Sequence, residues 1–171
     1  HQTMLDLIVN ETKAARRGKQ ARIAIKVNSL IDPECIDALY VASQAGVRVD
    51  LVVRGICGLK PQVKGLSENV TVRSLLGHFL EHSRVFYFKN APKGQRTFLG
   101  SPDWMPRNFF RRVEIAFPVE EEKQEAQILQ MLDDYMADNK YATELKGTGR
   151  DLKVPRRNRK LYSVQESLIE E

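Results

Sequence analysis

The chain has 171 residues, of which 42% are hydrophobic and 29% charged, and this predicts one packed domain that needs no disulfide or structural metal. The composition excludes a disordered chain, and no apolar run approaches the roughly 20 residues that span a bilayer. The net charge of +5 predicts a surface that attracts anions: nucleic acid, phosphorylated small molecules or an acidic membrane face. Cys35 and Cys57 lack metal-site spacing, so a reducing cytoplasm is expected, with peripheral membrane association left open.

Helices and strands are predicted to alternate in the first third of the chain. A helix comes first, and strict alternation at 22–28 (RIAIKVN) then indicates a strand. Asp32 can cap a second helix, and another strand follows at 47–53. This order favours a right-handed parallel crossover, so polar residues after the strands should gather at one edge of the sheet. Lys26 and Asn28 are expected to leave the sheet there on the same side.

Shorter strands and a closing helix are predicted next. Short strands are plausible at 70–73, 84–88 and 97–99, and a strong strand is expected at 111–119 (RRVEIAFPV). Its period of two puts Val113, Ile115 and Phe117 on one face and leaves Arg112 and Glu114 on the other. The closing helix has an apolar stripe made of Ile128, Leu132, Tyr135 and Met136. Three aromatic residues are expected in the core: Trp104, Phe109 and Phe110.

The carboxyl-terminal part has a weaker pattern. We expect a single domain over 1–171, with a core at about 3–138 and an extension at 139–171 that covers the domain or reaches a neighbour. The basic run at 153–160 (KVPRRNRK) is interpreted as a solvated tail, although a nucleic-acid-binding module that uses it is an alternative. Strands that alternate with helices predict an α/β sandwich.

The chemistry is concentrated between 77 and 114. His82 and Arg84 are two residues apart at the start of a strand, so both side chains can face one ligand. An imidazole beside a guanidinium suits phosphoryl chemistry, because the first can attack or donate a proton and the second grips two oxygens. Gly100, Ser101 and Asp103 follow in the arrangement G-S-x-D. No Walker-type loop is present, so a P-loop nucleotide fold is not predicted.

This spacing is similar to the half-site of the phospholipase D superfamily, H-x-K-x-x-x-x-D followed by G-S-x-N or G-S-x-D. Two positions differ, since Arg84 replaces the lysine and Lys89 stands where the aspartate would be. A phosphodiesterase or nuclease that pairs two His82 half-sites in a homodimer is therefore the alternative prediction rather than the leading one.

Three segments together carry a more specific resemblance: 53–59 (VRGICGL), 73–88 (RSLLGHFLEHSRVFYF) and 98–119 (FLGSPDWMPRNFFRRVEIAFPV). They resemble the second phospholipase-D-like domain of polyphosphate kinases of the histidine-phosphorylating type, and the likeness extends over about 3–160. The resemblance implies a phospholipase-D-like α/β/α sandwich with a mixed sheet, in a chain that is a fragment of a larger one. It also implies reversible transfer of the terminal phosphate of ATP to polyphosphate.

The resemblance assigns roles to two residues. Arg54 holds ATP phosphates, and His82 lines the ATP pocket and assists transfer, so the two are expected to converge on one anionic ligand. The phosphorylated histidine belongs to the preceding domain and matches neither His78 nor His1, so this fragment should be inactive alone. Mg²⁺ is the implied cofactor, with its ligands outside this segment. The implied partners are ATP or ADP, polyphosphate, the preceding domains and further copies in a homo-oligomer, without specific nucleic acid.

A wider set of polar residues is expected to support the phosphate contacts. Transfer of a phosphoryl group needs positioning and cations more than covalent work from the protein. Arg112 and Glu114 have a second interpretation as a same-face ion pair on a partly exposed strand. The supporting candidates are Lys26, Asn28, Arg84, Ser101, Asp103, Arg107, Arg112 and Glu114.

Overall fold

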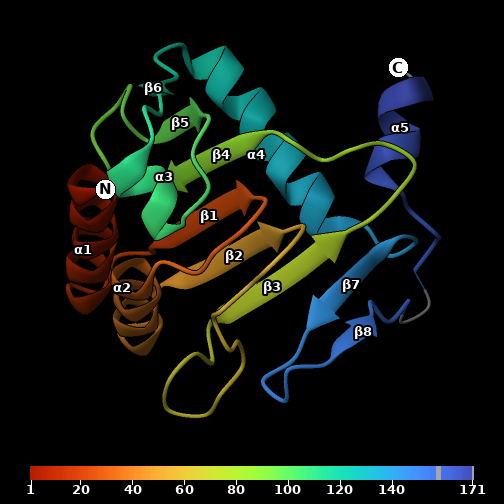
Figure 1. Cartoon of the computed structure of the whole chain (residues 1–171), viewed down its shortest axis with the longest axis horizontal. Helices are drawn as coiled ribbons and strands as arrows, with labels where there is room; N and C mark the ends of the chain where they lie inside the picture. The colour runs from red at the N-terminus through yellow and green to blue at the C-terminus, as the bar shows by residue number, and fades with distance from the viewer. Residues whose placement is uncertain (157–158, 171) are drawn as a thin grey trace.

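The computed structural model describes residues 1–156 and 159–170. In this part of the chain one mixed sheet has the strand order β6-β5-β4-β1-β2-β3-β7-β8 (Figure 1). The strands are β1 (Arg22–Val27), β2 (Arg48–Val53), β3 (Val70–Leu75), β4 (Arg84–Phe88), β5 (Thr97–Gly100), β6 (Ala116–Pro118), β7 (Ala142–Leu145) and β8 (Asp151–Lys153). Strands β1, β2 and β3 are parallel, and the remaining neighbours pair antiparallel.

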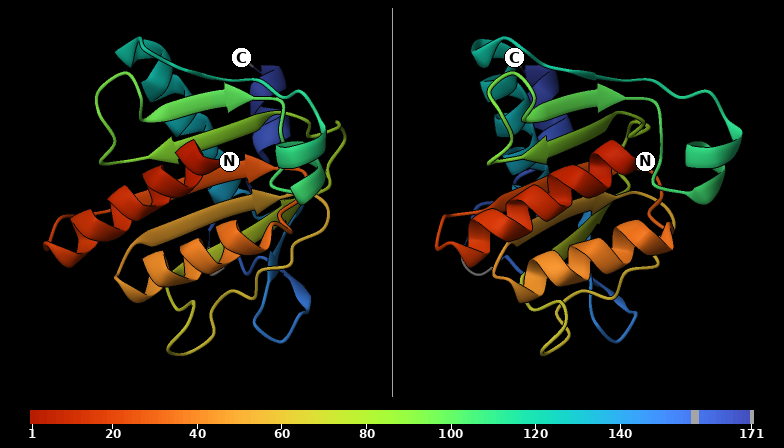
Figure 2. Two further views of the ribbon diagram at one scale, coloured as in Figure 1. Left: turned by 60° about the vertical axis from the view of Figure 1, so that its left-hand side comes forward. Right: turned by 90° about the vertical axis from the view of Figure 1, so that its left-hand side faces the viewer.

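Helices cover both faces of this sheet. Figure 2 shows α1 and α2 side by side on one face, with α4 and α5 behind the sheet. The helices are α1 (Gln2–Arg16), α2 (Pro33–Gln44), α3 (Pro106–Arg111), α4 (Glu122–Ala137) and α5 (Val164–Glu170). The predicted α/β/α sandwich with a mixed sheet is confirmed. Among the helices of the described ranges, none is both long and apolar enough to cross a membrane.

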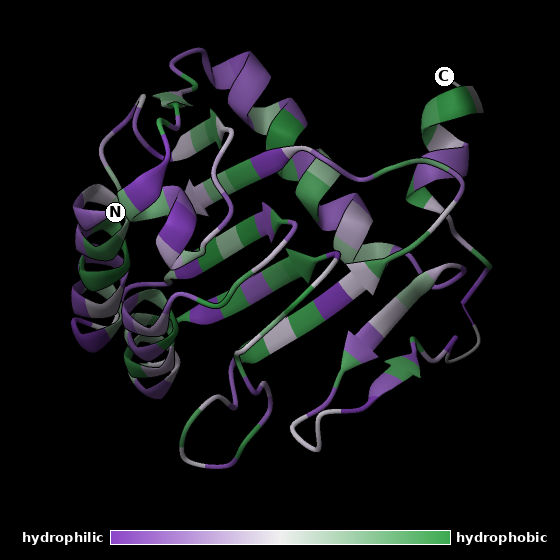
Figure 3. Ribbon diagram, viewed as in Figure 1, coloured by the Kyte–Doolittle hydropathy of each residue, from purple (hydrophilic) through white to green (hydrophobic). Residues whose placement is uncertain are grey.

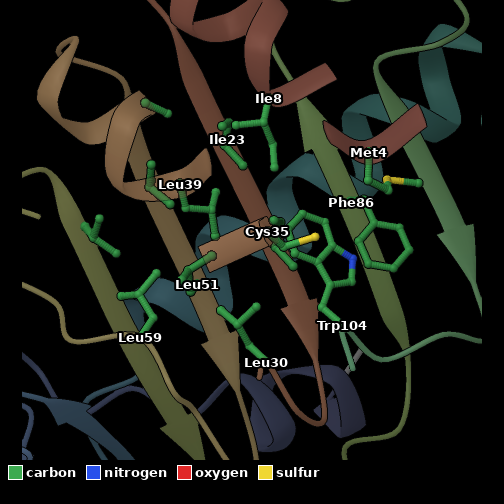
Figure 4. Close-up of a cluster of buried hydrophobic side chains, with 14 of the residues drawn as sticks. Met4, Ile8, Ile23, Leu30, Cys35, Leu39, Leu51, Leu59, Phe86 and Trp104 are labelled. Carbon is green, nitrogen blue, oxygen red and sulfur yellow. The ribbon is translucent and has the colours of Figure 1, made fainter. Parts of the chain in front are cut away.

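The larger core lies under α1 and α2. Alternate residues of the central strands point to this face, where Ile25 and Leu51 are fully buried and occupy paired positions of β1 and β2. Leu39 of α2 covers them, and Phe86 stacks on Trp104 with ring centroids 5.8 Å apart (Figure 4). Asp32 caps α2 as predicted, because its carboxylate accepts a hydrogen bond from the Cys35 backbone N–H at 3.0 Å.

The predicted strand at 111–119 is wrong. Helix α3 occupies Pro106–Arg111, and only Ala116–Pro118 pairs with β5 at the edge of the sheet. The side chains of Val113, Ile115 and Phe117, predicted to share one face of a strand, are 98%, 66% and 53% exposed. Alternation of apolar residues indicates a face, but it does not show whether another element covers that face. Of the aromatic residues expected in the core, Trp104 is buried and Phe109 packs partly against the core, whereas Phe110 of α3 is exposed.

The carboxyl-terminal extension takes part in the fold. Strand β7 pairs with β3, β8 pairs with β7, and Val164 at the start of α5 is buried in a second cluster with Leu75 and Tyr135. The basic run predicted to be solvated includes Arg157 and Asn158, which lie outside the described residues. Val154, within that run, is buried.

Candidate functional site

A polar cleft of about 550 Å³ opens at the edge of the sheet where β1 ends and β4 begins. We call it the His82 cleft. It brings together residues from the end of β1, the start of β4, the end of β5 and helix α3, so it joins segments far apart in the sequence. Its lining is Asn28, His82, Arg84, Gly100, Ser101, Asp103, Arg107, Asn108, Arg112 and Glu114.

Arg84 is held by a two-point ion pair with Asp103. Its Nε lies 3.2 Å from Oδ1 and its Nη2 lies 3.1 Å from Oδ2. The same Oδ1 accepts hydrogen bonds from the backbone N–H groups of Asn28 at 2.7 Å and Ser29 at 3.2 Å. Asp103 therefore fastens the end of β1 to the start of β4, and Arg84 is fixed in direction before any ligand arrives.

The imidazole of His82 lies at the exposed rim of the cleft against Arg84. The Arg84 Nη1 atom is 2.8 Å from His82 Nδ1 and donates to the His82 carbonyl oxygen at 2.7 Å. The same Nη1 atom lies 3.1 Å from the other ring nitrogen, Nε2, so the guanidinium is close to both nitrogens of the imidazole. A guanidinium has only donors, so it can be paired only with a ring nitrogen that carries no proton.

Glu114 organises the opposite wall. It accepts hydrogen bonds from the Ser101 hydroxyl and, at 2.6 Å, from the Asn108 amide, and it lies 3.4 Å from the Arg112 Nε atom. These contacts, the Ser101 hydroxyl foremost, lower the pKa of Glu114 below its ordinary value. Arg112 and Glu114 thus form the expected ion pair, but in the loop between α3 and β6 rather than on a strand.

Glycine at position 100 is a steric requirement of this wall. A Cβ atom there would lie 2.8 Å from the Ile115 carbonyl oxygen, closer than real Cβ contacts, and a tight 3.1 Å from the Pro102 ring. In the G-S-x-D arrangement, Gly100 therefore allows two backbone segments to approach closely. The side chains of Ser101 and Asp103 then form the hydrogen bonds that hold the walls of the cleft together.

Two buried amides of the cleft lack hydrogen-bond partners for their oxygens within the described chain. They belong to Asn28 and Asn108, whose residues are 8% and 5% exposed. Buried polar groups are rarely left unpaired in a folded protein, because the cost of removing them from water is then not recovered. An amide oxygen only accepts hydrogen bonds, so each of these two oxygens requires a donor, such as a water molecule. Asn108 is not among the residues predicted from the sequence, because no spacing rule points to it.

Arg54 lines a separate cavity of about 380 Å³ between β2, β3 and β7. One of its terminal nitrogens, Nη1, is buried without a partner in the described structure. The expected convergence of Arg54 and His82 in one concavity is not observed. A residue of each cavity is joined by a backbone hydrogen bond: Gly55 of the Arg54 cavity donates its N–H to the carbonyl oxygen of Asn28 of the His82 cleft at 2.7 Å. A Cβ atom at Gly55 would approach that oxygen to 3.0 Å.

Lys26 is not in the cleft, although it was a predicted phosphate contact. It is 2% exposed and points to the α4 face, where its Nζ atom lies 3.0 Å from Glu81 and 4.8 Å from the centre of the Tyr135 ring. Burial lowers the pKa of this lysine, the Glu81 carboxylate opposes the shift, and the positive charges of Arg84 and Arg54 add to it. Both guanidinium groups are thus near enough to Lys26 to influence its charge.

The carboxylates of the cleft do not fit a Mg²⁺ site. Magnesium prefers oxygen ligands in an octahedral arrangement. Asp103 is already occupied by Arg84 and two backbone N–H groups, and Glu114 by Ser101, Asn108 and Arg112. The one cluster of possible metal ligands in the described ranges combines His1, Asp32 and Cys35, and its Asp32 already caps α2.

Comparison with solved structures defines the class of protein first. Nuc from Salmonella typhimurium, a phospholipase D family member, superposes with a TM-score of 0.53 at 17% identity, covering 85% of this chain and 90% of that one. The chain therefore has the phospholipase D fold.

The family follows from closer matches. The sequence matches "Polyphosphate kinase C-terminal domain 2" over residues 1–165, and the chain belongs to this family. Polyphosphate kinase from Pseudomonas syringae pv. tomato is 49% identical over 98% of this chain and 23% of its own length. The crystal structure of polyphosphate kinase from Porphyromonas gingivalis is 34% identical with a TM-score of 0.93, over 99% of this chain and 26% of that one. The chain thus spans about a quarter of the length of these relatives.

Proposed function

We propose that this chain is a catalytic domain of a longer polyphosphate kinase and takes part in reversible transfer of the terminal phosphate of ATP to polyphosphate. In this proposal the preceding domains contribute the phosphorylated histidine and the ligands of Mg²⁺, the full-length chain forms a homo-oligomer in the cytoplasm, and the isolated domain does not turn over. Family membership supports the proposal, as does the short share of the relatives that the chain spans.

The observation that carries the proposal is the rigid polar architecture of the His82 cleft. Phosphoryl transfer depends on positioning and on cations that stabilise charge on the transferred group. Arg84 is fixed by Asp103 and holds the imidazole of His82 at the rim, while Arg107 and Arg112 line the same cleft. The arginines favour an anionic guest, and the imidazole lies beside them as a group that can donate or accept a proton.

Arg54 fits the proposal as a contact to a more distant part of the same guest. Arg54 directly follows β2, and Arg84 is the first residue of β4. Only β1 lies between these two strands, which are therefore about 10 Å apart at ordinary strand spacing. An ATP triphosphate or a polyphosphate chain is an extended polyanion. We propose that it extends from the Arg54 cavity across Asn28 to the His82 cleft, with phosphates at both guanidinium groups.

The phosphodiesterase alternative is weaker at one position. The superfamily half-site uses a lysine two residues after the histidine, whereas Arg84 occupies that position and is held at two points by Asp103. This chain therefore has no lysine ammonium at the position where the half-site of the phospholipase D superfamily has one. Hydrolysis of a simple phosphodiester by the purified chain, abolished by His82→Ala, would favour this alternative.

The test is ATP-dependent polyphosphate synthesis by the full-length protein that carries this domain. We expect His82→Ala and Arg54→Ala each to lower kcat/KM by about 100-fold or more, as for loss of a general acid or an electrostatic contact. Lys89→Ala is the matched control, because Lys89 is an exposed cation that directly follows β4. It therefore lies at the end of β4 that is opposite to Arg84 and the cleft. Wild-type turnover in the Arg54 or His82 variant would refute the assigned roles.

A further inference from the structure

Four polar side chains that the proposed chemistry does not use are buried together on the α4 face. Lys26, Glu81, Tyr135 and Gln165 are 2%, 8%, 6% and 4% exposed. They come from β1, from the loop before β4, from α4 and from α5, so nothing in the local sequence brings them together. A buried polar cluster assembled from four separate segments requires a physical explanation.

The centre of this cluster is the Glu81 carboxylate, which receives three donors. Its Oε2 lies 3.0 Å from Lys26 Nζ and accepts a hydrogen bond from the Tyr135 hydroxyl at 2.6 Å. Its Oε1 accepts from Gln165 Nε2 at 2.5 Å. Burial raises the pKa of Glu81, but these donors together outweigh burial and lower it, so the carboxylate is held in its charged form.

The cluster grips the chain on both sides of His82. Lys26 Nζ donates to the Ser83 hydroxyl at 2.8 Å, one residue after His82, and Glu81 precedes it directly. Gln165 forms two hydrogen bonds with the backbone of Phe79, accepting from its N–H at 3.0 Å and donating to its carbonyl oxygen at 2.9 Å. Figure 1 shows this loop, between β3 and β4, passing beside α5.

Apolar packing contributes little to the placement of this loop. Its large side chains Leu76, Phe79 and Leu80 are exposed rather than buried. The loop also passes so close to α5 that a Cβ at Gly77 would lie 2.2 Å from the Gln165 Oε1 atom. The direction of the loop, and of the imidazole that it carries, is therefore set mainly by the polar cluster.

Hydrogen bonds suit this task better than apolar contacts, because their strength depends on distance and angle. A buried ion pair is weak evidence for stability, and its best-attested benefit is the choice of one geometry. Accurate geometry matters in catalysis, since a misplacement of about 1 Å can lower a rate by about 100-fold.

We propose that Glu81, held by Lys26, Tyr135 and Gln165, is a positioning residue for His82, so that α4 and α5 determine where the imidazole lies. The inference rests on the proposed function, because it concerns the histidine assigned to assist phosphate transfer. None of the four side chains lines the His82 cleft, and in this proposal they act through the backbone on either side of His82.

The experiment compares two tyrosine-to-phenylalanine changes in the full-length enzyme. Tyr135→Phe removes one donor to Glu81 and keeps the ring. Tyr162→Phe is the matched control, because the Tyr162 hydroxyl pairs with Ser167 at 3.2 Å. We expect Tyr135→Phe to lower kcat for polyphosphate synthesis about 10-fold with less than about a twofold change in KM for ATP. The control is expected to keep both constants, and equal behaviour of the two variants overturns the inference.

A double variant separates positioning from general damage to the fold. In a His82→Ala background Tyr135→Phe should cause no further loss of kcat, because the group that it positions is gone. A full additional 10-fold loss would overturn the inference. If Tyr135→Phe does not fold, Gln165→Met removes the hydrogen bonds of Gln165 with Phe79 and Glu81 and is judged by the same criteria.

A structural readout keeps the inference distinct from the proposed function. The NMR signals of the His82 imidazole should shift or broaden in Tyr135→Phe and stay unchanged in Tyr162→Phe. If the full-length protein makes no polyphosphate, the proposed function fails while this comparison still decides the positioning role. Unchanged His82 signals in Tyr135→Phe would reject that role even in an active enzyme.

Discussion

The face of the sheet that α1 and α2 cover is packed with aliphatic and aromatic side chains. The face that α4 covers, here called the polar face, has smaller apolar clusters and between them buries a lysine, a glutamate and a tyrosine hydroxyl in mutual contact. Figure 3 shows polar residues interrupting the hydrophobic colour of β1 and β2. In β1 the buried Ile25 faces the first side and the buried Lys26 faces the second. Strand β1 therefore contributes to an apolar core on one face and to the buried polar cluster on the other.

The two faces differ in what their contacts contribute, which is stability of the domain on one face and placement of the His82 loop on the other. Apolar burial is non-directional and stabilises whatever geometry excludes water. The Glu81 cluster costs desolvation and adds direction, and it lies next to the loop that carries His82. We infer that the first face mainly stabilises the domain and the second mainly orders its site, and substitutions on each face can test that division.

The largest effect on stability is expected on the apolar face. Leu39→Ala in α2 removes a fully buried side chain and leaves a cavity, so the free energy of unfolding should fall by about 4 kcal/mol. Val41→Ala on the same helix is the control, because Val41 is exposed and should change the value by less than about 0.5 kcal/mol. Urea denaturation followed by circular dichroism measures both, and similar losses in the two variants would contradict the assignment of this core.

A somewhat smaller effect is expected from Lys26→Met on the polar face. The change leaves Glu81 buried with only the Tyr135 and Gln165 donors, and loss of one partner of a buried pair costs about 3 kcal/mol. The double variant Lys26→Met with Glu81→Gln should regain most of that stability in the same assay but not the rate of polyphosphate synthesis. A double variant no more stable than Lys26→Met would show that the pair serves stability after all.

Much of the apolar face could be predicted from the sequence, because it depends on local patterns. The strand at 22–28 and the helix capped by Asp32 follow from alternation and from a residue type that favours helix starts. His82 and Arg84 were identified by their spacing, and the structure brings them together with Asp103. Neighbouring positions and strand periodicity carry this information.

The polar face and the edge of the sheet could not be predicted in this way. Alternation placed Lys26 on the same side as Asn28, but β1 ends at Val27, and the period of two does not continue beyond it. The pairing of Glu81 with Gln165 joins residues 84 positions apart, which no local pattern encodes. The exposed Val113 shows the converse, since alternation cannot reveal whether another element covers the face.

The pH dependence of stability should differ between the two faces. Because the pKa of Glu81 is lowered in the folded state, its contribution is present above the unfolded value of about 4.3 and is lost as the pH falls below that value. The pKa values of Glu114, Glu122, Glu144 and Glu166 are also lowered, so these groups contribute to the loss of stability in acid as well. The pH dependence of the unfolding free energy is therefore compared between wild type and Tyr135→Phe. The difference between the two curves gives the part that depends on the hydrogen bond from Tyr135 to Glu81.

We expect Tyr135→Phe to lose less stability than wild type between about pH 6 and about pH 3, because the Tyr135 donor is one of the groups that lower the pKa of Glu81. Leu39→Ala should run parallel to wild type over the same range, since it removes no titrating group. Urea denaturation at several pH values measures the slopes. If Tyr135→Phe also runs parallel to wild type, the hydroxyl does not stabilise the charged carboxylate.

The smallest effect concerns a polar group on the otherwise apolar face. Asp32→Ala removes the carboxylate that accepts the Cys35 N–H at the start of α2, and loss of such a cap costs about 1 kcal/mol. Glu34→Ala, an exposed acidic residue in the same first turn, is the control and should cost only a few tenths of a kcal/mol through the helix dipole. Thermal unfolding of both variants gives the comparison. Equal losses would mean that charge near the helix end, rather than the hydrogen bond from Cys35 N–H to Asp32, stabilises α2. The geometry of side-chain hydrogen bonds would then be important only in the Glu81 cluster of the polar face.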